Sequence, residues 1–154
     1  MRKLLILIFL FCAAYCTAAT PVISEVRLMY KQGVKNKIVC EQLLKMLEPY
    51  NANNPLLFGY KACATMVMAK HSGNPFNKLS HFKKGSKMLA KAIELDLNNP
   101  ELRYLRFTAQ MNAPSFLDYK SHLEVDKAFL QRSVQTIVDL QLKQMIASYL
   151  KKVG

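Results

Sequence analysis

Apolar residues in this chain recur at steps of three and four between short clusters of Asn, Pro and Gly, and no alternating stretch is long enough for a strand. Such spacing puts apolar side chains on one face of a helix. Five Gly and six Pro in 154 residues are also too few for a sandwich or barrel, which turns about every ten residues. The sequence therefore predicts an all-α fold of six or seven helices in antiparallel pairs, and a 51% hydrophobic content supplies its core.

The first residues have the pattern of an export signal. Two basic residues precede an apolar run, residues 4–11, which is shorter than the roughly 20 residues that a membrane span needs. Small residues follow, so we expect cleavage after Ala18 or Ala19, with an uncleaved anchor or a buried helix as the alternative. The prediction is a signal peptide over residues 1–19 and a single domain over residues 20–154, located in the periplasm or outside the cell.

The four cysteines fall into two groups. Cys12 and Cys16 lie in the predicted signal, and Cys16 leaves a lipoprotein open as a further alternative. Cys40 and Cys63 lie in helix-like stretches of the mature chain. Two cysteines are too few for a disulfide-stapled fold, so they are either two small buried residues or one bridge between neighbouring helices.

Apolar spacing and turn residues together set the expected helix positions. The expected helices span approximately residues 24–32, 37–47, 56–71, 79–97, 101–112, 121–137 and 139–150. The helix over 56–71 is apolar nearly all round, which predicts that it is the most buried and that Met66 lies in the core.

Some finer expectations concern single apolar residues. In the second helix four of them are spaced to share one face: Ile38, Leu43, Leu44 and Leu47. The segment that follows residue 112 is apolar enough for Phe116 and Leu117 to enter the core. Ser121 begins a capping-box spacing, and Asp139 is expected to cap the last helix.

The junction over residues 91–101 resembles the end of one tetratricopeptide unit and the start of the next, because small Ala92 allows close helix packing before an Asn-Asn-Pro turn. The chain also resembles a group of short secreted bacterial proteins of unknown function with tetratricopeptide-like character. The segments that carry this resemblance are 54–62, 74–85 and 101–119. It implies an exported all-helical bundle and brings no catalytic residue with it.

The charge is strongly positive, +12 for the whole chain and +10 once the two cations of the predicted signal are removed. Lys83, Lys84, Lys87 and Lys91 are spaced to form a basic ridge on one exposed helix face. The ridge is either a solvated surface or a binding patch for an acidic protein, anionic lipid or envelope polysaccharide. Nucleic acid is not expected, since no recognition motif is present.

Arg103 and Arg106 form a second group of candidate binding residues on the following helix. With Gln110 they share a stripe that can face outward or into a groove, while Leu105 and one aromatic residue face inward. They either form structural salt bridges or grip the carboxylates of a ligand. The acids considered as structural partners are Glu101, Asp118 and Asp126.

No set of residues with recognisable catalytic spacing is present. The histidines, His71, His81 and His122, lack metal-ligand spacing, and no nucleophile motif or paired carboxylates are found. We therefore expect no enzyme activity, metal or cofactor. The favoured function is a helical scaffold that docks an acidic partner, and the alternative is a basic peripheral protein that attaches to anionic lipid or polysaccharide.

Overall fold

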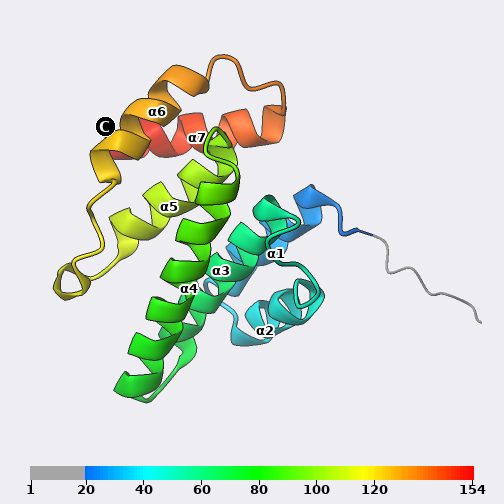
Figure 1. The fold of residues 1–154 in the computed structure, drawn as a ribbon, viewed down its shortest axis with the longest axis vertical. Coiled ribbons are helices and arrows are strands. Elements are labelled where there is room, and N and C mark those ends of the chain that lie inside the picture. Colours follow the sequence, from blue (N-terminus) through cyan, green and yellow to red (C-terminus); the bar gives the residue numbers. More distant parts are fainter. Residues whose placement is uncertain (1–19) are drawn as a thin grey trace, which may run out of the picture.

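The computed structural model describes residues 20–154, and the predicted signal over residues 1–19 lies outside them. The described residues form seven α-helices and one short 3-10 helix, without a strand, which confirms the all-α prediction (Figure 1). The elements are α1 (Ile23–Gly33), α2 (Lys37–Met46), α3 (Pro55–His71), α4 (Pro75–Leu95), α5 (Pro100–Asn112), η1 (Ser115–Leu117), α6 (Leu123–Ser133) and α7 (Leu140–Val153). Neighbouring helices contact each other in pairs, α1 with α2, α3 with α4 and α5 with α6.

Asparagine side chains start several of these helices. Asn54, Asn74 and Asn99 each accept a hydrogen bond from a backbone N–H in the first turn of α3, α4 and α5, and a proline follows each of them. Proline suits this position because its missing N–H would have no partner inside the helix. The expectation that α4 begins at residue 79 was wrong, because Asn74 and Pro75 start it four residues earlier. It also ends two residues before the expected 97.

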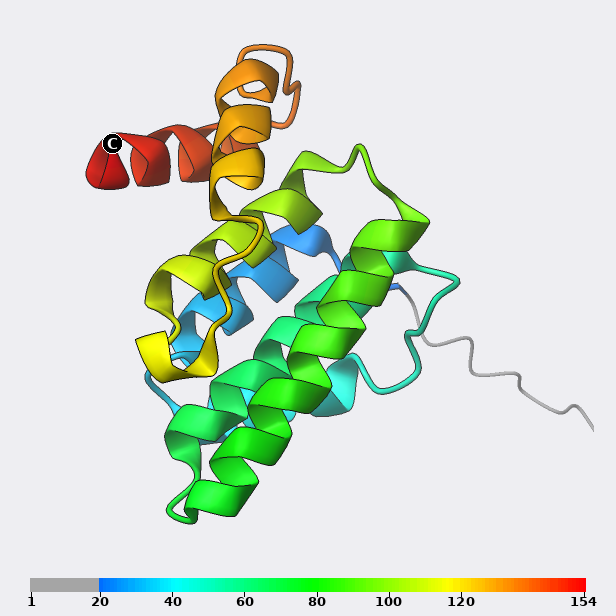
Figure 2. The same cartoon turned by 60° about the vertical axis from the view of Figure 1, so that its left-hand side comes forward.

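The larger hydrophobic core is centred on α3, which packs antiparallel to α4 (Figure 2). Met66 is only 7% exposed, so the predicted burial of α3 is confirmed. Close packing of the two helices depends on Gly85 of α4, where an added Cβ would lie 2.5 Å from the carbonyl oxygen of Ala62. The fold therefore has no room for a side chain at this crossing.

A second, smaller core lies between α5, α6 and α7. It contains Phe107 of α5 together with Leu130, Val134, Leu142 and Ile146. Leu102 and Leu105 on the same α5 belong to the larger core. Thus α5 is shared by both cores, and Figures 1 and 2 show α6 and α7 together at one end of the molecule.

Three local expectations were wrong. Ile38 is 64% exposed because it lies two positions, about 200° of helix rotation, from buried Cys40. Phe116 is 82% exposed and Leu117 is only half-buried, since η1 ends at Asp118 with a positive φ of 46° that turns the chain. The capping box at residues 121–124 does not form, because α6 begins at Leu123 without a side-chain cap, and it ends at residue 133 instead of 137.

Candidate functional site

The two arginines of α5 share one buried carboxylate. Arg106 donates to Asp126 of α6 from Nε and Nη2 at 2.6 and 2.8 Å, and Arg103 donates from Nη1 at 2.9 Å. Asp126 is fully buried. Of the structural partners considered from the sequence, Asp126 is therefore the one that pairs with both arginines, and the cluster joins α5 to α6. Gln110, which was expected on the same stripe facing outward or into a groove, is fully buried.

Further contacts hold Arg103 in place at the edge of this cluster. Its Nε donates to the carbonyl oxygen of Leu97 at 3.1 Å, and its guanidinium lies 5.1 Å from the ring centre of Phe129. A cation over an aromatic face is attracted by the ring quadrupole. The Arg103 side chain remains 16% exposed, whereas that of Arg106 is 8% exposed.

These arginines line a cleft of about 340 Å³ between α4, α5 and the segment that leads into α6. Its lining residues are Ala90, Ile93, Glu94, Leu97, Arg103, Arg106 and His122. One wall is thus formed mainly by small and aliphatic side chains of α4 and the turn after it, and the other by Arg103, Arg106 and His122. Leu97 is 56% exposed, so an apolar surface is available beside the arginines.

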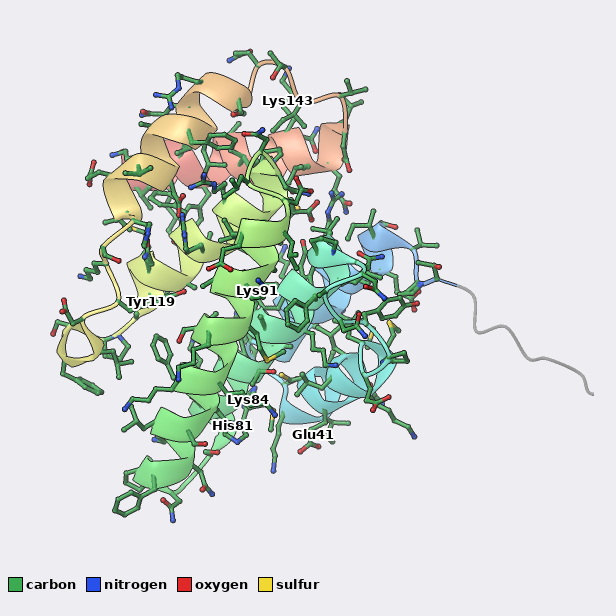
Figure 3. All side chains as sticks on the ribbon, in the orientation of Figure 1. Glu41, His81, Lys84, Lys91, Tyr119 and Lys143 are labelled. Atoms are coloured by element: carbon green, nitrogen blue, oxygen red, sulfur yellow. The ribbon has the colours of Figure 1, made fainter. Side chains whose placement is uncertain are left out.

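All four ridge lysines are exposed on α4 and lie within about 100° of helix rotation of one another, on one face. Positions three or four apart stack on a helix, so Lys83 and Lys87 continue the row of Ala90 and Glu94 toward the N-terminus of α4. Lys84 and Lys91, labelled in Figure 3, are seven residues apart and form a neighbouring row. Lys91 also pairs with Glu94 at 3.2 Å.

The predicted binding residues therefore differ in their relation to the cleft. Arg103 and Arg106 line it, and Lys83 and Lys87 lie on the row that leads into it. The exposed Lys91–Glu94 pair contributes little stability but neutralises the one acid of the cleft wall. The cleft consequently keeps an excess of positive charge, because two arginines face a single aspartate.

A second charged cluster was not predicted from the sequence. Arg27 of α1 donates from Nε and Nη2 to the two oxygens of Glu101 at 2.7 Å each, and from Nη2 to Asp139 at 2.8 Å. The Tyr60 hydroxyl donates to the same Glu101 carboxylate. Arg27 and Glu101 are 5% and 3% exposed, so the cluster ties α1, α3 and α5 to the start of α7.

The electrostatics of this cluster follow from its hydrogen bonds. The Glu101 carboxylate raises the pKa of Arg27 above its already high ordinary value. Burial, followed by the charge of Glu101, raises the pKa of Tyr60. The hydrogen bond from Arg27 lowers the pKa of Asp139. The sequence signal for this cluster was Arg27 itself, which lies four residues after Ile23 on the apolar side of α1.

The two cysteines of the described residues have little nucleophilic character. Cys40 and Cys63 are free and buried, which settles the open alternative against a bridge. Burial raises their pKa to about 11 and about 12, so the nucleophilic thiolate is scarce at neutral pH. Among residues 20–154 no three His, Cys, Asp or Glu side chains are grouped to hold a metal ion. No helix in this part of the chain is long and apolar enough to cross a membrane.

Comparisons of the chain with family models, curated proteins and solved structures give no match. The fold is therefore known from the structure alone, in which residues 20–154 form seven α-helices with neighbouring helices in contact. The resemblance to short secreted tetratricopeptide-like proteins is supported at the level of an all-helical chain, and no family is identified.

Proposed function

We propose that the protein is an exported, non-enzymatic helical scaffold with a tetratricopeptide-like arrangement, and that the cleft between α4, α5 and α6 docks an acidic protein partner. One observation carries the proposal. Arg103 and Arg106 share a single carboxylate, Asp126, at the wall of an open cleft whose other wall includes exposed Leu97. The proposed ligand of this cleft is a peptide segment with acidic and apolar side chains.

The arginine wall retains capacity for a carboxylate. A guanidinium has five N–H donors. Arg103 uses Nε for Leu97 and Nη1 for Asp126, and its Nη2 has no hydrogen bond among the described residues. Arg103 is also the more exposed of the two arginines, so an acidic side chain can reach it without displacing Asp126. We infer that Arg103 is the main contact for the partner and that Arg106 holds Asp126 in place.

The apolar wall supplies affinity that salt does not screen. Ile93 and Leu97 would be covered by an aliphatic or aromatic side chain next to the partner's acidic residue. Lys83 and Lys87 lie farther along the same row of α4 and would attract acidic residues outside the cleft. Long-range attraction of this kind raises the association rate more than the affinity and weakens with salt.

The test uses paired substitutions at exposed leucines, which leave the buried ion pairs intact. Leu97→Asp puts a negative charge in the cleft, and Leu140→Asp is its matched control at a 72% exposed position outside it. Each variant carries a photo-crosslinking residue in place of Ala90, and partners are captured from the envelope fraction at about 0.05 M and about 0.5 M salt.

The proposal predicts one protein, crosslinked through position 90 at both salt concentrations, with at least tenfold less product in Leu97→Asp and an unchanged yield in Leu140→Asp. Equal yields from the two variants would refute docking in the cleft. Capture of lipid or glycan at low salt only, lost when Lys83, Lys87 and Lys91 are changed to Glu, would favour the alternative of a basic peripheral envelope binder.

A further inference from the structure

The N-terminal end of α4 projects away from the rest of the molecule. All residues from 73 to 80 are exposed, and a Cβ added at Gly73 would meet nothing within 4 Å. This projecting end carries Phe76, which is 83% exposed, and Leu79 one turn later, which is 39% exposed. Side chains of this size seldom remain in water without a role when they are grouped.

A third exposed apolar side chain, 40 residues away in sequence, belongs to the segment that packs against α4 through Tyr119. Phe116 in η1 is 82% exposed. The rings of Phe82 and Tyr119 meet edge to face at 5.2 Å, which holds the segment after η1 against α4. Phe82 is about 9 Å along the helix from Phe76, and Tyr119 is at most about 10 Å of chain from Phe116. Figure 1 shows the turn that contains η1 on the same side of the molecule as the N-terminal half of α4.

Lysines outnumber acids in the segments that form this end. Residues 49–93 contain seven lysines and no Asp or Glu, although the chain has ten acids. These lysines are Lys61, Lys70, Lys78, Lys83, Lys84, Lys87 and Lys91. Lys78 lies between Phe76 and Leu79, and both it and Lys120 are exposed. Asp118 is the acid near Phe116, and Lys120 follows it by two residues.

We propose that this end of the molecule docks on an anionic lipid bilayer, with Phe76, Leu79 and Phe116 entering the headgroup region and Lys78 and Lys120 contacting lipid phosphates. The shape and charge of the surface support a bilayer as the occupant. A bilayer interface accepts apolar side chains from a convex end and adds attraction for lysine within a Debye length.

Membrane docking at this end is compatible with the proposed scaffold and independent of it. The cleft residues of α4 begin at Ala90, 14 residues from Phe76, which is about 21 Å along the helix. A molecule held by its α3–α4 end would therefore leave the cleft open to a second partner. Failure of either proposal leaves the other unaffected, because the two use different residues and different assays.

The absence of tryptophan from the sequence provides a direct test. Phe116→Trp places a single fluorescent reporter at the proposed contact, and Val138→Trp places one at a 91% exposed position in the α6–α7 connection. Both full-length variants are mixed with phosphatidylcholine vesicles that contain about one third phosphatidylglycerol and brominated acyl chains, which quench nearby tryptophan. Residues 4–11 are apolar and can attach the full chain by themselves, so reporter depth is measured instead of bound protein.

On anionic vesicles, we expect the fluorescence emission of the tryptophan at position 116 to shift to the blue and to be quenched. The tryptophan at position 138 should remain in water, with its emission unchanged. Adding Lys78→Glu and Lys120→Glu to the Phe116→Trp variant should weaken its partitioning by at least tenfold, because each lysine near an anionic surface contributes about fivefold. Circular dichroism checks that these exposed substitutions leave the fold unchanged. The proposal is overturned if position 116 is not quenched, if both positions are quenched alike, or if neutral vesicles give the same result.

Discussion

Replacing Glu101 by glutamine should destabilise the protein strongly although the two side chains have nearly the same size. Glu101 accepts two hydrogen bonds of 2.7 Å from Arg27 and a third from the Tyr60 hydroxyl. The substitution removes the negative charge and leaves Arg27, which is 5% exposed, without its main partner. Hydrogen bonds to charged groups each contribute about 1.5–3 kcal/mol.

The expected loss in the free energy of unfolding follows from this geometry. Removing one partner of a buried ion pair costs about 3–5 kcal/mol. Asp139 and Gln141 still accept hydrogen bonds from Arg27, so we expect the lower end of that range, about 3 kcal/mol. In a chain of this size, each kcal/mol lost from the free energy of unfolding lowers the melting temperature by about 2–4 °C. The melting temperature of Glu101→Gln should therefore be about 6–12 °C below that of the parent.

Thermal unfolding followed by far-ultraviolet circular dichroism measures this decrease. Glu94→Gln is the matched control, because Glu94 is 65% exposed and pairs with Lys91 at 3.2 Å. An exposed pair of this kind contributes at most about 1 kcal/mol, so the control should melt within about 4 °C of the parent.

A double substitution separates the loss of charge from a loss of packing. In a Tyr60→Phe background, where no buried hydroxyl loses its acceptor, Arg27→Met combined with Glu101→Leu removes both charges and should be more stable than Glu101→Gln, because no unpaired ion remains buried. The reasoning is refuted if Glu101→Gln melts as the control does, or if the double variant is less stable than Glu101→Gln.

Three further substitutions or reactions test other parts of the structure. Gly85→Ala should lower the free energy of unfolding by about 1–3 kcal/mol, because its Cβ would lie 2.5 Å from a backbone oxygen of α3. Gly73→Ala, whose Cβ would meet nothing within 4 Å, should lower it by less than about 1 kcal/mol. Equal melting temperatures of the two variants would contradict this packing. The pKa of Asp139 is lowered in the fold, so its carboxylate stabilises the protein above its ordinary value of 3.8 and this contribution disappears as the pH falls through the lowered pKa. Asp139→Asn should accordingly be less stable than the parent at neutral pH and equally stable in strong acid, and a difference that persists in acid would contradict the ion pair. The pKa values of Cys40 and Cys63 are about 11 and about 12, so iodoacetamide should modify these thiols only when denaturant opens the fold. Rapid labelling of the two cysteines in the folded chain would disprove their burial.

Most helix positions could be predicted because their signals are local. The apolar character of residues 62–69 predicted the burial of α3, and Asp139 caps α7 as expected by accepting a hydrogen bond from the Leu142 N–H. The start of α4 was missed although its signal was present. Asn74 and Pro75 repeat the pattern of Asn54 and Pro55, which was correctly interpreted as a helix start.

The candidate cleft was only partly visible in the sequence. Arg103 and Arg106 were identified together because they lie three residues apart on one helix. Their common partner, Asp126, is 20 or more residues away and was one of three acids considered. The sequence therefore indicated a cationic stripe, but the apolar wall that Leu97 adds to it depends on how α4 packs beside α5.

The sequence by itself determined the all-α class and most of the helix boundaries, because hydrogen bonds within a helix, its caps and its apolar face involve residues at most a few positions apart. Only the tertiary structure decided which charges are buried together. Arg27 meets Glu101 across 74 residues and Asp139 across 112, and no local pattern specifies such partners. They come together because α5 is packed between two hydrophobic cores, and a charge buried there is stable only when its partner is brought to it by the same packing.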